Sequence, residues 1–343
     1  MPGFAWEAAA AGSGFGSVAG LGVGLGLRPG LALGLDAGFE VRLDFGSAAP
    51  ALFGRARELD LLERAAETAW RCGRLVPALI SGDAGAGKTA LAEVLAYRLG
   101  ACGWTPAWGR SPEHEGASAG RPWSRVVAAL TAVGVPEPAA VGGIEGSATT
   151  RFGAHRAAAA YVTGAAGRGP LLLVFDDLHR AGEETLALLT ALVAEAVAGP
   201  VLLVGTYRAS EVTPELTGLL AEFARADPTR VYAGALSEEA TAELVRNTLM
   251  RDEDVEATAV RVIHRRSAGN PFFARELARL YESEGSAALA AVPTGARDVI
   301  RHRVARLPES ARTVLRRAAV LGRDIDLDVL ISALDDEELV LDA

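Results

Sequence analysis

The segment SGDAGAGKTA, residues 81–90, constrains the fold of this chain more than any other stretch. It follows the short apolar run LVPALI, which reads as a buried strand of a parallel sheet. The stretch KTALAEVLAYRLG follows, with the apolar spacing of a helix. A strand, a glycine-rich turn and a helix in this order are typical of a loop that wraps around an anion.

The spacing of Gly82, Gly87, Lys88 and Thr89 satisfies the phosphate-loop pattern G-x-x-x-x-G-K-[ST]. Lys88 is the single lysine among 34 basic residues, so it resists a strong compositional preference for arginine. A compact ammonium reaches the β- and γ-phosphates, whereas the wide planar fork of arginine does not fit. The alternative is a glycine-rich turn with an exposed lysine.

We therefore predict an ATP or ADP site with Mg²⁺, in which Thr89 offers a hydroxyl to the metal. The predicted phosphate-binding residues are Gly82, Asp83, Ala84, Gly85, Ala86, Gly87, Lys88, Thr89 and Ala90.

A second acidic element follows the apolar run PLLLVF, where Asp176 and Asp177 stand at the end of an expected strand. We predict that Asp176 holds Mg²⁺, directly or through water, and that Asp177 polarises the attacking water. The alternative is a polar strand end that caps the next helix. His179 is a lone histidine and receives no catalytic role.

Further apolar runs at 104–110, 200–208 and 229–236 alternate with helical patterns, which predicts an α/β layer with a parallel sheet. Ligands of such sheets bind at the carboxyl ends of the strands. Thr206 and Arg208 are therefore predicted to face the γ-phosphate, with a surface arginine as the alternative. The helical patterns cover residues 121–133, 151–166, 183–198 and 214–226.

The rest of the chain reads as helical. Ser237 is an expected helix N-cap, and two later helices meet at AGNP, where Pro271 either touches the nucleotide base or belongs to a plain interhelical turn. Arginines after residue 294 lie among apolar residues at helical spacing and precede many acids, so a solvated helix face is favoured over DNA contact.

Composition excludes several classes of protein. A formal net charge of −9 argues against holding nucleic acid or anionic lipid by bulk electrostatics. Cys72 and Cys102 fit neither a disulfide framework nor a zinc site, and we expect reduced cytoplasmic thiols. Glycine interrupts the apolar residues 12–38, so neither a signal peptide nor a spanning helix is expected there, and residues 1–50 are predicted to be a flexible leader.

Together, several segments resemble the STAND branch of AAA-type ATPases, and most closely the nucleotide-binding modules of large bacterial LuxR-type and SARP-type regulators. The resemblance covers residues 53 to about 330 and is carried by FGRARELDLLERA, LISGDAGAGKTALAEVLA, AWGRSPEHEGASAGRPWSRVVAAL, LLLVFDDLHRAGEETLALL, VLLVGTYRASEV, AGNPFFARELARL and ARLPESARTVLRRAAVLG. It implies that Gly54 and Arg55 lie near the adenine, that Pro271 contacts the base, and that Thr206 and Arg208 are the residues expected after the fourth strand.

The resemblance also implies a division into domains. We expect a leader at 1–50, a P-loop α/β domain at 51–236, a helical lid at 237–290 and a partial winged helix at 291–343. Relatives usually continue into helical repeats and a DNA-binding domain, so a fragment or a truncated regulator is expected. Relatives usually read DDLHWAD where this chain reads DDLHRAG, which puts efficient hydrolysis in doubt.

Three functions are compatible with these patterns. The leading hypothesis is a nucleotide switch that binds ATP and Mg²⁺ and hydrolyses ATP slowly. The alternatives are an oligomeric ATPase motor or loader, and an interaction module stabilised by a permanently bound nucleotide. Partners other than the nucleotide are expected to be a second copy or further regulatory domains, with no membrane and no direct nucleic-acid contact.

Overall fold

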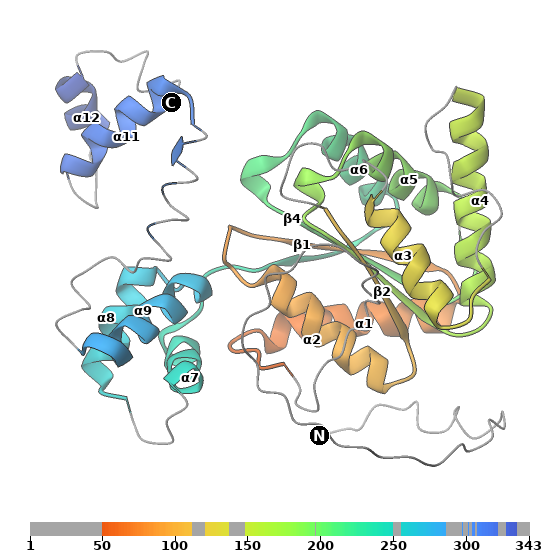
Figure 1. The fold of residues 1–343 in the computed structure, drawn as a ribbon, viewed down its shortest axis with the longest axis horizontal. Coiled ribbons are helices and arrows are strands. Elements are labelled where there is room, and N and C mark those ends of the chain that lie inside the picture. Colours follow the sequence, from red (N-terminus) through yellow and green to blue (C-terminus); the bar gives the residue numbers. More distant parts are fainter. Residues whose placement is uncertain are drawn as a thin grey trace, which may run out of the picture. The chain divides into compact units, whose positions relative to one another are not determined.

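The structure is a computed structural model that describes most of the chain after Ala49 (Figure 1). The described residues are 50–111, 121–136, 148–195, 197–249, 255–285, 307–321 and 327–334, with single positions at 297, 301, 304 and 305. The leader expected at residues 1–50 lies outside them, except for Pro50.

A five-stranded parallel sheet forms the centre of the α/β domain, as the alternating pattern predicts. Its strands stand in the order β2-β3-β4-β1-β5. The bounds are β1 Leu75–Ser81, β2 Thr105–Arg110, β3 Leu171–Asp176, β4 Val201–Tyr207 and β5 Thr229–Tyr232. Because β1 and β3 both flank β4, the loops after these three strands meet at one edge of the sheet.

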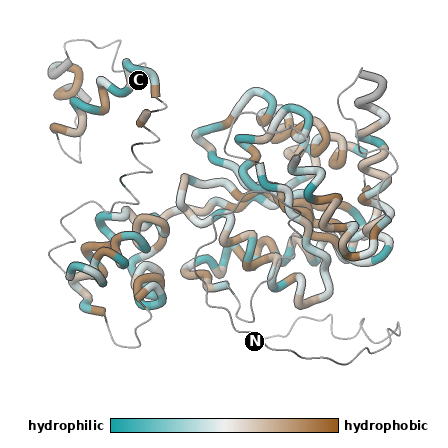
Figure 2. The backbone as a smooth tube through the Cα atoms, in the orientation of Figure 1, coloured by the Kyte–Doolittle hydropathy of each residue, from teal (hydrophilic) through white to brown (hydrophobic). Residues whose placement is uncertain are grey.

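Helices cover both faces of this sheet (Figure 1), and their bounds are α1 Ala56–Cys72, α2 Lys88–Ala101, α3 Arg121–Ala132, α4 Ala148–Ala166, α5 Glu183–Ala194 and α6 Pro214–Arg225. Helices α1 and α2 pack on one face, and α3 to α6 pack on the other. The inner strands β1, β3 and β4 are buried on both sides and are the most continuously hydrophobic part of the domain (Figure 2). Burial on both sides explains why their sequences are apolar runs without alternation.

Two short 3₁₀ helices follow β3 and β4. They are η1 Leu178–Arg180 and η2 Ala209–Glu211. Each begins within two residues of a strand end, so its side chains stay close to the edge of the sheet where the phosphate loop lies.

After β5 the described chain is helical, with α7 Glu238–Leu249, α8 Ala257–Ser267 and α9 Pro271–Glu284. These three helices share a small core of their own, which includes Leu244, Ile263 and Leu277. The hydroxyl of Ser237 accepts a hydrogen bond from the Ala240 amide, 3.2 Å away, as expected of an N-cap. We keep the name lid for the described residues between Ser237 and Gly285, and the role that the name implies stays a prediction.

Two more helices, α11 Glu309–Leu321 and α12 Leu327–Leu334, pack against each other through Val314, Ala318 and Leu330. They fall within the region expected to begin a winged helix, much of which lies outside the described residues. The winged-helix assignment stays a prediction.

Two elements are shorter than the sequence pattern indicates. The strand expected at 229–236 ends at Tyr232, because the Leu236 amide donates to Gly269 of the lid and leaves the sheet. The helix expected at 183–198 ends at Ala194, since Val197 and Gly199 pair with the backbone of residues 73–75. In both places a backbone partner distant in sequence overrides the local pattern.

The apolar stripe of α1 gives a direct test of the core. Leu62 is fully buried, whereas the adjacent Leu61 is 39% exposed. We expect Leu62→Ala to lower the free energy of unfolding by about 2–5 kcal/mol, because it removes buried methyl groups and leaves a cavity. Leu61→Ala is the matched control and should change it by about 0.5 kcal/mol or less. Urea unfolding measures both, and equal losses would contradict the packing described.

Candidate functional site

The loop between β1 and α2 surrounds the ammonium group of Lys88. Lys88 is 7% exposed, and its Nζ donates to the carbonyl oxygens of Gly82 at 2.9 Å and Asp83 at 2.8 Å. Burial, followed by the charge of Arg208, lowers the pKa of Lys88, and nearby aspartates oppose this shift. The lysine is thus held inside the loop that the sequence motif predicts, at the N-terminus of a helix whose dipole favours anions.

Asp176 is the most buried acid of the site, with 1% of its surface exposed. The Thr89 hydroxyl donates to both of its carboxylate oxygens at 3.1 Å, and the Thr206 hydroxyl donates to Oδ1 at 2.6 Å. Arg110 donates to Oδ2 from Nε at 3.1 Å, and its Nη2 is also 3.1 Å from that oxygen. The carboxylate therefore joins α2, β4 and β2 at the end of β3.

Asp177 directs its carboxylate toward the cavity through an unusual backbone conformation. Its φ is +60°, in the left-handed region that few residues other than glycine adopt. Its amide donates to the Thr206 hydroxyl at 2.9 Å, which fixes this conformation. Burial and then the neighbouring Asp176 raise the pKa of Asp177. A carboxylate with a raised pKa is a better proton acceptor than an ordinary one.

A charged cluster lies beyond the end of β4. Arg208 Nη1 donates to Glu211 Oε1 at 2.6 Å, and this hydrogen bond and charge lower the pKa of Glu211 despite its partial burial. The His179 side chain is fully buried, with Nε2 3.6 Å from Glu211 Oε2. Burial, followed by the Arg208 charge, lowers the pKa of His179 to about 4, so the ring is neutral at pH 7.

The lid touches the phosphate loop directly. Asn270 caps α9 by accepting hydrogen bonds from Phe272 and Phe273, and its Nδ2 donates to the Ala84 carbonyl at 2.9 Å. The Phe272 amide donates to Gly85 O at 3.3 Å. A Cβ at Gly85 would lie 2.8 Å from both Asn270 Oδ1 and Phe272 Cβ, and the φ of Gly85 is +78°. The approach of the lid thus requires glycine at this position of the loop.

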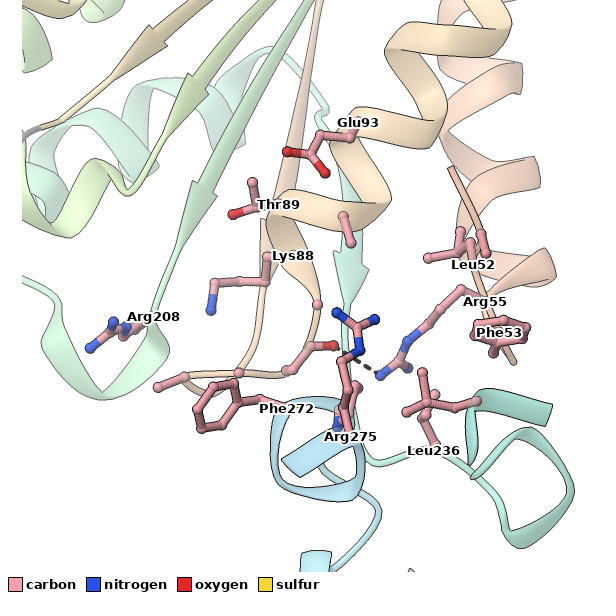
Figure 3. Close-up of a pocket in the computed structure, with 18 of the residues that line it drawn as sticks. Leu52, Phe53, Arg55, Lys88, Thr89, Glu93, Arg208, Leu236, Phe272 and Arg275 are labelled. Atoms are coloured by element: carbon pink, nitrogen blue, oxygen red, sulfur yellow. Dashed lines mark hydrogen bonds between the residues drawn. The ribbon is translucent and has the colours of Figure 1, made fainter. Parts of the chain in front are cut away.

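Arg55 ties the start of α1 to the same region. It is 5% exposed, pairs with Glu58 at 3.1 Å, and donates to the carbonyl oxygens of Ala86, at 3.3 Å, and Gly234. One of these bonds is drawn in Figure 3. Arg55 therefore connects the phosphate loop to the segment that leads into the lid.

These elements enclose a cavity of about 400 Å³, a size suited to a small organic ligand. Figure 3 shows Lys88 and Arg208 at one end and Leu52, Phe53 and Leu236 at the other. The cavity is lined by Ala51, Leu52, Phe53, Arg55, Ala84, Gly85, Ala86, Gly87, Lys88, Thr89, Ala90, Glu93, Asp177, Arg208, Leu236, Leu244, Pro271, Phe272 and Arg275. One end therefore favours an anion, and the other an apolar group.

Most residues selected from the sequence line this cavity, and the exceptions are Gly54, Gly82, Asp83, Asp176 and Thr206. Gly82 and Asp83 accept the hydrogen bonds of Lys88, while Asp176 and Thr206 form the network described above. Gly54 packs against the lid instead, since a Cβ there would lie 2.4 Å from Ala240 Cβ. The functional roles assigned to these residues stay predictions.

Sequence reasoning misses several residues of the site. The pattern identifies Arg110 only as the end of a strand, although arginine at a carboxyl strand end is a usable signal. Glu93 lies one helical turn after Thr89, a spacing that puts both on one face of α2. Asn270 directly precedes the proline that the sequence singles out. The apolar wall carries no local signal, because its members come from separate segments.

The site suits a divalent cation only together with a phosphate. Among the described residues, no group of three or more histidine, cysteine or acidic side chains is arranged to hold a metal. Mg²⁺ usually binds through one or two carboxylates, waters and substrate phosphates. The Thr89 hydroxyl oxygen lies 3.1 Å from Oδ1 of Asp176 beside the phosphate loop, and these two side chains fit that kind of site.

Comparison with known proteins agrees with this geometry. Residues 51–204 match the family model of the AAA ATPase domain. The ORC2 protein of Aeropyrum pernix, solved in ADPNP-ADP complexes, is 16% identical, with 88% of this chain and 85% of that chain covered and a TM-score of 0.57. A search of curated proteins finds no match.

Two other solved structures are similar at lower scores. RuvB of Thermotoga maritima is 18% identical, with 83% of each chain covered and a TM-score of 0.43. A STAND protein with a tetratricopeptide repeat sensor from Pyrococcus horikoshii is 17% identical, with 84% of this chain and 38% of that chain covered and a TM-score of 0.43.

The parallel sheet, the phosphate loop and the helix after it define a P-loop NTPase fold. Within this fold class, it is the model of the AAA ATPase domain that residues 51–204 match. None of the described helices combines the length and apolar character of a membrane span.

The buried His179 predicts a specific loss of stability in acid. Its folded pKa of about 4 lies below the ordinary 6.5, so the unfolded chain binds more protons between these values. Stability from neutral His179 is therefore present above pH 6.5 and is lost as the pH falls toward 4. Between pH 7 and 4.5 we expect the unfolding free energy to fall by about 2 kcal/mol more in the parent than in His179→Leu.

Urea unfolding at the two pH values measures this difference. His264→Leu, which removes a histidine from the lid, is the control. If the parent and His179→Leu lost equal stability between the two pH values, the lowered pKa of His179 would be contradicted.

Proposed function

We propose that this chain is a nucleotide switch, in which ATP and Mg²⁺ bind between the α/β domain and the lid and slow hydrolysis restores a closed, ADP-bound form. In this proposal Lys88 and Arg208 contact the terminal phosphate, and Thr89 and Asp176 hold Mg²⁺. Asp177 accepts a proton from the attacking water or polarises it.

One observation carries the proposal: the AGNP turn of the lid is hydrogen-bonded to the phosphate loop through Ala84 and Gly85. A ligand that rearranges this loop changes the partners of Asn270 and Phe272 at the start of α9. In this proposal, phosphate binding and the position of the lid are therefore linked. A switch needs such a link, because a ligand shifts a conformational equilibrium only when it binds the two conformations with different affinity.

The two ends of the cavity support a nucleoside triphosphate as the ligand. Phosphates fit the end that contains Lys88, the helix N-terminus and Arg208, and a base fits among Leu52, Phe53 and Leu236. Pro271 and Arg55 also line the cavity and would contact the nucleoside. Mg²⁺ would neutralise charge on the phosphate oxygens when bound. The ADPNP and ADP complexes of the Aeropyrum pernix ORC2 protein agree with this choice of ligand.

We also propose that the switch is the nucleotide-binding module of a STAND-type transcriptional regulator. The basis is the resemblance of the GNPFF, WGR and DDLH segments to ATP-binding LuxR-type and SARP-type regulators. This chain reads DDLHRAG where such regulators usually read DDLHWAD, and the two changed residues follow Asp177 closely in the chain. Arg180 ends η1 and Gly182 is the N-cap of α5, so the change is expected to affect the rate of ATP hydrolysis. Slow hydrolysis suits a switch whose output is its bound state.

Lys88 gives the first test. We expect Lys88→Ala to weaken binding of ATP with Mg²⁺ by roughly tenfold to a hundredfold, the effect of losing a hydrogen bond to a charged group. Lys88→Arg keeps the charge but should also weaken binding, because the guanidinium does not fit the loop. Isothermal titration measures the affinities, with the exposed Arg64→Ala as control. Unchanged affinity in Lys88→Ala would refute nucleotide binding at this loop.

The coupling of loop and lid gives the second test. Asn270→Ser keeps an N-cap acceptor for α9 but is too short to donate to Ala84. We expect ATP with Mg²⁺ to slow amide hydrogen exchange in α9 of the parent, and to slow it less in this variant. Asn247→Ser, at an exposed position of α7, is the control. Equal slowing in the parent and Asn270→Ser would separate lid position from nucleotide binding and refute the switch.

An oligomeric motor or loader would use the same cavity and is the alternative. Turnover per chain that rises steeply with protein concentration would favour the motor, because an arginine from a neighbouring subunit raises the rate in such assemblies. A nucleotide that is stoichiometric after purification and never exchanges would favour a stable interaction module.

A further inference from the structure

Arg110 occupies a position that the proposed chemistry does not use. It is the last residue of β2, and in the parallel register with β3 it stands opposite Asp176. Its Nε and Nη2 both lie 3.1 Å from one oxygen of that carboxylate, Oδ2. Two contacts from one planar guanidinium to one oxygen make this a specific pair.

The pair supplies the positive charge that Asp176 needs. A carboxylate that is 1% exposed costs several kcal/mol unless a cation or hydrogen bonds compensate it. Thr206 donates to Oδ1 and Thr89 to both oxygens, but these groups are neutral. Lys88 directs its hydrogen bonds to Gly82 and Asp83. Among the residues that the structure describes, Arg110 is thus the cation in contact with Asp176.

We propose that Arg110 competes with the divalent cation for Asp176 and thereby sets the Mg²⁺ concentration that nucleotide binding requires. The inference rests on the proposed function. A divalent cation held by Asp176 would use the carboxylate that the guanidinium already contacts, so the two positive charges would repel each other and compete for it. Arg110 thus weakens metal binding at the site it stabilises.

The surroundings allow Arg110 to leave. Its side chain is 51% exposed, so the guanidinium exchanges its contact with Asp176 for water at small cost. Glu93, on α2 and lining the cavity, offers another partner. Burial raises the pKa of Glu93, and the charge of Arg110 opposes this, so the arginine already lies within the electrostatic reach of both carboxylates.

A Mg²⁺ titration of nucleotide binding tests the competition. The probe is a fluorescent N-methylanthraniloyl derivative of ATP, and Mg²⁺ is raised from excess EDTA into the millimolar range. For Arg110→Gln we expect half-maximal binding at about fivefold lower Mg²⁺ than for the parent, the effect of removing a charge pair with one half-exposed member.

Arg98→Gln is the matched control, because Arg98 is 55% exposed, pairs with Glu63 at 3.0 Å and does not line the cavity. It removes the same charge from the chain, so a general change in the protein's field would appear in it as well. We expect it to stay within about twofold of the parent, since an exposed charge far from the metal is screened by salt.

Several outcomes would overturn the inference. An unchanged or higher Mg²⁺ requirement in Arg110→Gln would make the pair purely structural. Weaker binding of the probe at saturating Mg²⁺ would make Arg110 a ligand of the nucleotide. If Arg110→Gln does not fold, Arg110→Lys, which keeps the charge but loses the planar pair of contacts, should shift the requirement in the same direction by less, and no shift would overturn the proposal.

The parent separates this inference from the proposed function. A parent that does not bind the probe at any Mg²⁺ concentration refutes the proposed function and, with it, this inference. A parent that binds with the same Mg²⁺ dependence as Arg110→Gln refutes the competition alone.

Discussion

The buried carboxylate of Asp176 is the constraint on which the site depends. A charge inside a sheet edge is tolerated only when donors surround it, and here they come from α2, β4 and β2 through Thr89, Thr206 and Arg110. Thr206 also holds the amide of Asp177 and so fixes the left-handed backbone that turns the second acid toward the cavity. One hydrogen-bonded network therefore positions both acids: Asp177 lines the cavity, and Asp176 accepts a hydrogen bond from Thr89, which also lines it.

Charge in this protein is organised locally. The chain carries a formal net charge of −9, yet more cations than acids line the cavity: Arg55, Lys88, Arg208 and Arg275, with Glu93 and Asp177. Burial, and then the charge of Arg208, lower the pKa of Lys88, and nearby aspartates oppose this shift. An anion that enters the cavity would reduce the repulsion between Lys88 and Arg208. The site thus suits a small, highly charged anion.

The lid is coupled to the phosphate loop through backbone groups rather than side-chain packing alone. Asn270 both caps its own helix and reaches the loop, so the geometry of α9 and that of the loop are not independent. Gly85 permits this approach because a Cβ would collide with the lid. Arg55 performs a similar function from the other side by holding Ala86 and Gly234. The shape of the cavity therefore depends on the positions of α1, α9 and the phosphate loop together.

The sequence by itself determined the parallel sheet, the phosphate loop and the acids at the end of β3, because each is encoded in contiguous residues: an apolar run, a glycine spacing, a strand end. It did not reveal Arg110, Glu93 or the apolar wall. Those depend on strand order and on lid packing, which bring together residues far apart in the chain. The order β2-β3-β4 places Arg110 beside Asp176, and no local pattern specifies which strands become neighbours.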